Sequence, residues 1–153
     1  MSMEQKTSLP YPAADLVPHE KPMLLVDMVL QIADDDDPQS CSIVEASAPE
    51  GGVFVADGQV LHEYLIELMA QSIAAVDGFK SKPDNKQPAK PAKGFLAGID
   101  AFTCTNTPTP GSKLQVRLKK TFAFGSVFIF EGSVHEENEI LATGQLKIWK
   151  EDK

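Results

Sequence analysis

The sequence predicts an α+β fold in which an antiparallel sheet wraps around one long central helix. The main observation is residues 62–79, HEYLIELMAQSIAAVDGF, which are apolar on nearly every face and predict a buried helix. About two strand-like stretches precede this helix and about four follow it. Alternation of polar and apolar side chains is clearest around Val116 and Leu118. A helix that is apolar all round must be covered, and a curved sheet supplies that cover.

The part before the helix predicts an irregular arm and two strands of a single domain, residues 1–153. Prolines make residues 1–15 an irregular N-terminal arm. The apolar run 22–32 predicts a buried strand, or a short helix followed by a strand, and residues 40–48 have a strand's composition. Between them, ADDDDPQ at 33–39 predicts an exposed turn. A calcium loop is the alternative, but the glycine and distal Glu of an EF-hand are missing.

Turn signals divide the rest of the chain. Asp57 and Gly58 predict a turn into the helix, and Gly78 predicts its C-cap. The lysine- and proline-rich residues 80–94 predict a flexible, solvated loop. Further turns are predicted at 107–112 and 135–139, with strands between them.

Composition excludes several classes of protein. The 153 residues carry a formal net charge of −8, which argues against a nucleic-acid binder. Cys41 and Cys104 stand far apart and form no metal-ligand spacing, so no metal site is expected. We see no secretory leader and no stretch typical of a membrane span, so we expect a cytoplasmic protein.

Glu67 is the residue of the helix that most needs an explanation. It stands between Ile66 and Leu68 on an otherwise apolar helix, where an unpaired buried carboxylate costs several kcal/mol. A catalytic role is one interpretation; an ion pair or a side chain that reaches solvent is the other. Gln71, one turn later, lies on the same face and is a candidate for lining a site, whereas Glu63 is expected to be ordinary surface.

Three stretches resemble the hotdog-fold 3-hydroxyacyl-[acyl-carrier-protein] dehydratases. They are LVPHEKPMLLVDMVL (16–30), LIELMAQSIAA (65–75) and FLAGIDAFTCTNTPTPGSKL (95–114). VADGQVLHEYLIELMAQ (55–71) is most similar to a divergent subgroup, the predicted dehydratases linked to aryl polyene biosynthesis. The resemblance implies a hotdog homodimer with a ten-stranded sheet, active sites at its interface, and a thioester carried on the phosphopantetheine of acyl carrier protein. No other cofactor is implied.

The resemblance also implies site residues, with one departure. Glu67 matches the family's catalytic Glu, but the position of its catalytic His, fourteen residues earlier, is Val53 here, followed by the retained Phe54. Val53 and Phe54 are therefore expected beside the substrate rather than in proton transfer. His62 at the helix start and Asp57 in the turn are candidates for the second catalytic group.

His19, in the Pro-His motif, has a mainly structural role in the family, and we expect it at the substrate-binding edge rather than in catalysis. His135 is expected on the surface. An acidic carrier protein needs a basic docking patch, for which two sets are available: Lys80, Lys82, Lys86, Lys90 and Lys93, or Arg117, Lys119 and Lys120. For the first set, a merely solvated loop is the simpler interpretation.

Three functions are compatible with these observations. The first is dehydration of a 3-hydroxyacyl thioester on acyl carrier protein, as in fatty-acid or polyene-like biosynthesis. The second is a non-catalytic hotdog subunit that partners an active dehydratase, which the absence of the usual His favours. The third is an acyl thioesterase, which the PHEKPMLLVD motif disfavours; fold alone would not separate it from the first.

Overall fold

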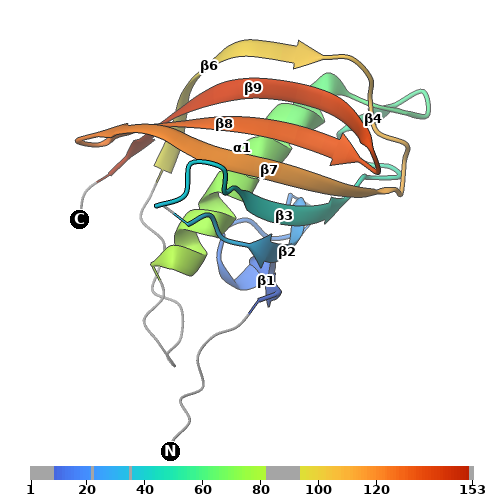
Figure 1. Ribbon diagram of the computed structural model, residues 1–153. Helices are drawn as coiled ribbons and strands as arrows, with labels where there is room; N and C mark the ends of the chain where they lie inside the picture. Colours follow the sequence, from blue (N-terminus) through green and yellow to red (C-terminus); the bar gives the residue numbers. More distant parts are fainter. Residues whose placement is uncertain (1–8, 22, 35, 82–93, 152–153) are drawn as a thin grey trace, which may run out of the picture.

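A seven-stranded antiparallel sheet curves around one long α-helix in the computed structural model, as the sequence predicts (Figure 1). The structure describes residues 9–21, 23–34, 36–81 and 94–151. The elements in chain order are β1 (Tyr11–Pro12), the 3-10 helix η1 (Ala13–Asp15), β2 (Val26–Gln31), β3 (Ser42–Ser47), β4 (Val55–Ala56), β5 (Gln59–Val60), α1 (His62–Lys80), β6 (Gly94–Cys104), β7 (Lys113–Phe124), β8 (Val127–Glu136) and β9 (Glu139–Lys150).

The strand order is β1-β2-β3-β7-β8-β9-β6, and every neighbouring pair is antiparallel. The eleven-residue strand β6 therefore forms one edge of the sheet, with β9 as its neighbour. β4 and β5 form a separate small hairpin at the entry to α1. Its turn is Asp57-Gly58, whose φ angles of 54° and 77° suit a two-residue hairpin loop, as predicted from the sequence.

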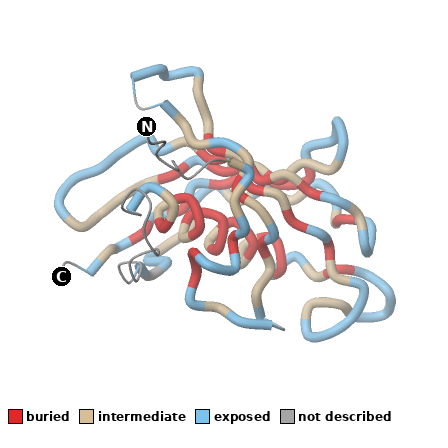
Figure 2. The backbone as a smooth tube through the Cα atoms, turned by 90° about the horizontal axis from the view of Figure 1, so that it is seen from below, coloured by how far each residue is buried: buried red, intermediate tan, exposed pale blue. Residues whose placement is uncertain are grey.

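The core lies between α1 and the concave face of the sheet. Leu65, Leu68 and Met69 are fully buried there, and each buried side chain of this size contributes about 1.5–3 kcal/mol to stability. Figure 2 shows the buried residues gathered on the helix and on the strand segments next to it. The helix stripe with Ile66 and Glu67 remains only half-buried, so the sheet covers one side of α1 and leaves the other partly open.

The prediction that Gly78 caps the helix is wrong. α1 continues to Lys80, and Gly78 is buried inside it. A Cβ atom at position 78 would lie 2.6 Å from the carbonyl oxygen of Leu16, so glycine is needed there for the close approach of the N-terminal segment. The same end of the helix is joined to the sheet by an ion pair of 2.5 Å between Asp77 and Lys150.

Other boundaries also differ from the sequence prediction. The two-residue strands β1, β4 and β5 were too short to predict from alternation. His135 belongs to β8 and is half-buried, not in a surface turn, because the turn is confined to Glu137 and Asn138. The turn at 33–39 is confirmed in its described part, where Asp34 and Asp37 accept local backbone hydrogen bonds. Most of the lysine-rich loop lies outside the described residues.

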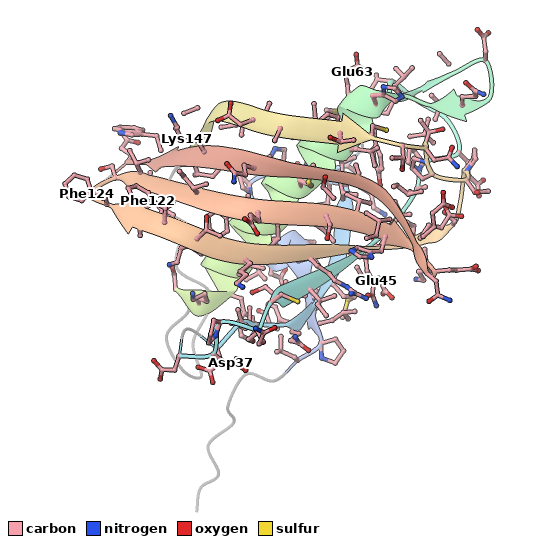
Figure 3. All side chains as sticks on the ribbon, turned by 45° about the horizontal axis from the view of Figure 1, so that its top comes forward. Asp37, Glu45, Glu63, Phe122, Phe124 and Lys147 are labelled. Carbon is pink, nitrogen blue, oxygen red and sulfur yellow. The ribbon has the colours of Figure 1, made fainter. Side chains whose placement is uncertain are left out.

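The convex face of the sheet carries an exposed apolar patch at the tip of the β7–β8 hairpin. Phe122 is 48% exposed and Phe124 is 76% exposed, and Figure 3 shows both near Lys147 at one end of the sheet. Across the described ranges, no helix is long and apolar enough to cross a membrane.

Candidate functional site

Glu67 lies in the N-terminal half of α1, where two side chains approach the same oxygen of its carboxylate. Gln71 Nε2 donates a hydrogen bond to Glu67 Oε2 at 3.2 Å, and His19 Nε2 lies 3.5 Å from the same oxygen. The side chains of His19 and Glu67 are 32% and 38% exposed. The carboxylate is therefore held on one side and open to solvent on the other, not fully buried as the apolar helix had indicated.

Gln71 connects the helix to the chain segment that precedes β2. Gln71 is 1% exposed, and both polar atoms of its side chain form hydrogen bonds. Gln71 Oε1 accepts a hydrogen bond of 2.8 Å from the backbone N–H of Leu25, while Nε2 donates to the carbonyl of Met23 at 2.7 Å and to Glu67. One amide thus fixes the position of a segment that is 46 to 48 residues away in sequence and orients the carboxylate one helical turn earlier.

His19 reaches Glu67 because the segment 16–25 is attached to α1 at two places. Leu16 is buried against Gly78, and Met23 and Leu25 are bonded to Gln71. His19 lies between these attachments. Its Nδ1 atom is buried and has no hydrogen-bond partner in the described part of the chain.

Val53 and Phe54 lie in the loop before the β4–β5 hairpin. Val53 is 72% exposed, whereas Phe54 packs edge-on against Tyr64 of α1, with ring centroids 5.8 Å apart. Burial, together with the negative charge of Asp27, raises the pKa of Tyr64. The Tyr64 hydroxyl donates to the carbonyl of Ser47 at 3.4 Å. Phe54 and Tyr64 therefore join this loop to the helix and leave Val53 pointing outward.

The other sequence candidates lie elsewhere. His62 is exposed at the first position of α1, and Asp57 is exposed at the hairpin turn. Neither is among the described side chains that hydrogen bond or pair with Glu67. Glu63 is exposed on the surface at the same end of the helix (Figure 3). The structure thus brings together Glu67, Gln71 and His19, and His62 and Asp57 are not among the described contacts of this group.

Sequence reasoning missed the contact between His19 and Glu67. The Pro-His motif was visible, but periodicity cannot reveal a contact between residues 48 positions apart. No sequence signal places the motif beside Glu67, because the contact depends on the hydrogen bonds between Gln71 and the backbone at Met23 and Leu25. A carboxylate, an imidazole and an amide in contact form an arrangement suited to acid–base chemistry, in which one group moves a proton and the others hold it.

Away from Glu67, a hollow lies on the convex face, across β7, β8 and β9. Its volume is about 380 Å³, and its lining includes Arg117, Lys119, Glu131 and Ser133. Ser133 Oγ lies 2.7 Å from His135 Nε2. Burial, and secondarily the charge of Arg117, lowers the pKa of His135. Among the described residues, no group of three or more His, Cys, Asp and Glu side chains could hold a metal ion.

Known proteins are similar to this chain over most of its length. Residues 11–153 match the family model of the ApeP-like dehydratases. A 3-hydroxyacyl-[acyl-carrier-protein] dehydratase, FabZ, from a Nitratiruptor species is 27% identical over 139 residues, which cover 90% of this chain and 94% of that protein.

Two solved structures are also similar. A chain of the dehydratase heterocomplex ApeI:P from Xenorhabdus doucetiae superimposes with a TM-score of 0.77 and 28% identity, covering 96% of this chain and 94% of that one. An uncharacterized protein from Pyrococcus horikoshii has a TM-score of 0.64 at 18% identity, covering 95% and 97%, and supports the fold alone. The fold predicted from the sequence, a hotdog, is confirmed.

Proposed function

Because the chain belongs to the ApeP-like dehydratase family, we propose that it dehydrates a 3-hydroxyacyl thioester carried on acyl carrier protein, with Glu67 as the group that moves a proton. The single observation that carries this proposal is the anchored carboxylate. Glu67 Oε2 is held by Gln71 and His19, while the side chain is open enough for a substrate to reach it. A carboxylate that is fixed yet accessible is the arrangement that general acid–base catalysis requires.

The chemistry sets what the site must do. A base removes a proton from C2 of the acyl chain, and an acid gives a proton to the leaving hydroxyl at C3, so that water departs and a C2–C3 double bond forms. A backbone N–H that bonds the thioester oxygen would stabilise the charge that develops there. In this proposal Glu67 supplies one of the two proton transfers, and the thioester arrives on the phosphopantetheine of the carrier protein as part of the substrate.

We propose that the second proton-transfer group belongs to a neighbouring hotdog chain. An edge strand as long as β6 presents a row of backbone groups that can pair with another chain. The half-buried stripe of α1, with Glu67 on it, is open to contact by a partner chain. A partner here would complete a site whose own loop offers Val53, which cannot transfer a proton.

This gives a second candidate function, a subunit that is active only beside a different hotdog chain. Val53 at the position where the resemblance places a histidine favours it, and so does the likeness to a chain of a dehydratase heterocomplex. In both candidates the carrier protein is acidic and docks on a local basic surface; two of the described candidates for that surface, Arg117 and Lys119, line the hollow on the convex face.

The test is to incubate the purified protein with a 3-hydroxyacyl thioester on acyl carrier protein and to follow the acyl mass. Loss of one water by the chain alone supports the enzyme, and loss only after a second hotdog dehydratase chain is added supports the partnered subunit. Release of the free acid would instead identify a thioesterase.

Two variants on α1 make the test specific to the proposed residue. Glu67→Gln should lower kcat on the order of 10²–10⁴-fold, because an amide cannot transfer the proton. Glu63→Gln, on the same helix but exposed, is the matched control and should keep the wild-type rate. Equal rates in the Glu67→Gln and wild-type proteins would contradict the proposal.

A further inference from the structure

We infer that His19 is a positioning residue for Glu67: it donates from Nε2 to Oε2 and leaves Oε1 as the oxygen that meets the substrate. The inference rests on the dehydratase function proposed above and assigns a role to a side chain that the resemblance treats as structural. It is carried by three observations, which are the way the 16–25 segment is held, the surroundings of the two ring nitrogens, and the choice of oxygen on Glu67.

The first observation is that contacts on both sides of His19 hold its segment against α1. The 16–25 segment is attached at Leu16, whose carbonyl oxygen would lie 2.6 Å from a Cβ at Gly78, and again at Leu25, whose N–H is bonded to Gln71. A side chain between two such attachments loses little further freedom when it contacts Glu67. The contact is therefore part of the folded structure and not a chance encounter of surface groups.

The second observation concerns the two nitrogens of the His19 ring. Nε2 lies 3.5 Å from Glu67 Oε2, whereas Nδ1 is buried and lacks a hydrogen-bond partner among the described residues. A proton on Nδ1 would be a buried donor without an acceptor, and a proton on Nε2 faces a carboxylate. The Nε2–H tautomer fits both surroundings.

This tautomer argues against proton transfer by His19. To accept or release a proton through Nε2, the ring must carry its other proton on Nδ1, where the described part of the structure provides no acceptor. An Nε2–H that stays in place can hold the carboxylate but cannot shuttle its proton. The geometry therefore assigns His19 to positioning and leaves proton transfer to Glu67.

The third observation is that both neighbours of the carboxylate point to the same oxygen. Gln71 Nε2 at 3.2 Å and His19 Nε2 at 3.5 Å both approach Oε2. A hydrogen bond from Gln71 and a close contact with His19 at one oxygen favour a single rotation of the carboxylate, with the other oxygen, Oε1, directed away from both. A fixed group of this kind reacts faster than a mobile one, because the reacting geometry is already formed.

The test compares His19→Gln with His19→Ala in the preparation that dehydrates the substrate, either the chain alone or the chain with its partner. The Gln amide can place an N–H near the position of His Nε2 but cannot titrate. We expect His19→Ala to lose on the order of 10²-fold in kcat, with KM little changed, and His19→Gln to recover most of that loss. His135→Gln, on the opposite face of the sheet, serves as the control for replacing a histidine.

Two kinetic results would overturn the inference. If His19→Gln is as inactive as His19→Ala, the ring transfers a proton, and if His19→Ala keeps the full rate, the residue has no role. A second readout does not depend on turnover. ¹⁵N NMR of the imidazole should show the Nε2–H tautomer for His19, with a change of its shift in Glu67→Gln.

The NMR result separates this inference from the proposed function. An Nδ1–H tautomer, or a His19 signal insensitive to Glu67→Gln, would overturn the positioning role even in an active enzyme. The Nε2–H tautomer in a protein that dehydrates nothing, while a known dehydratase is active under the same conditions, would support the contact and count against the proposed function alone.

Discussion

Replacing Gln71 by Met tests how the site is held together. Met has a similar length but cannot form the three hydrogen bonds that Gln71 makes to Leu25, Met23 and Glu67. The Leu25 N–H would lose its acceptor, and a buried group left in that state costs about 1–3 kcal/mol. The hydrogen bonds to Met23 and Glu67 contribute about 0.5–1.5 kcal/mol each. Part of this loss is offset in the variant, because Met23 is 40% exposed and water can bond to its carbonyl. We expect a loss of about 2–4 kcal/mol in the free energy of unfolding.

Urea unfolding measured by circular dichroism gives this free energy from the midpoint and slope. The matched control is Ser72→Ala, the next residue on the helix and equally buried, whose hydroxyl bonds only to the carbonyl of Leu68 within α1. This control should change stability by less than about 1 kcal/mol, since alanine is a better helix former. If Gln71→Met also costs less than about 1 kcal/mol, the glutamine does not anchor the segment and the reasoning fails.

Two further predictions concern packing and pH. Gly78→Ala should destabilise the protein by about 1 kcal/mol, because overpacking against the Leu16 carbonyl, about 1–3 kcal/mol, outweighs the better helix propensity of alanine; a higher Tm than wild type would contradict this. The pKa of His135 is lowered by burial and by Arg117, so the unfolded chain binds a proton more readily than the folded one. Stability from this group is present above about pH 6.5 and is lost as the pH falls. His135→Gln should therefore lose less stability than wild type between about pH 7 and about pH 5 in urea unfolding, and an equal loss would exclude His135 as the cause.

The architecture could be predicted because its signals are local. The apolar run at 62–79 could only be a buried helix, and the Asp57-Gly58 turn has a backbone chemistry that few alternatives share. The prediction that Gly78 caps the helix is wrong because glycine occurs both at helix ends and where two segments pack closely. Only the packing of Leu16 against the helix distinguishes the two uses.

The site was harder to predict because its contacts are long-range. Glu67 and Gln71 were recognisable as one face of a helix, since four residues make about one turn. Nothing in their spacing shows that Gln71 binds the backbone at Met23 and Leu25 and so brings His19 to Glu67. His62 and Asp57 are near Glu67 in sequence, but the described contacts of its carboxylate come from Gln71 and from His19, which is 48 positions away.

The way the 16–25 segment is attached has a consequence for heat sensitivity. Glu67 and Gln71 stand on the central helix, and removing that helix from the core is equivalent to unfolding the whole protein. His19 belongs to a segment that can detach when its hydrogen bonds to Gln71 break and Leu16 no longer packs against Gly78. Displacing His19 from the site therefore requires less free energy than displacing Glu67 and Gln71. On warming, catalysis should fade reversibly while the sheet and helix are still intact, so that the temperature limit of the activity is set by this short segment and not by the hydrophobic core.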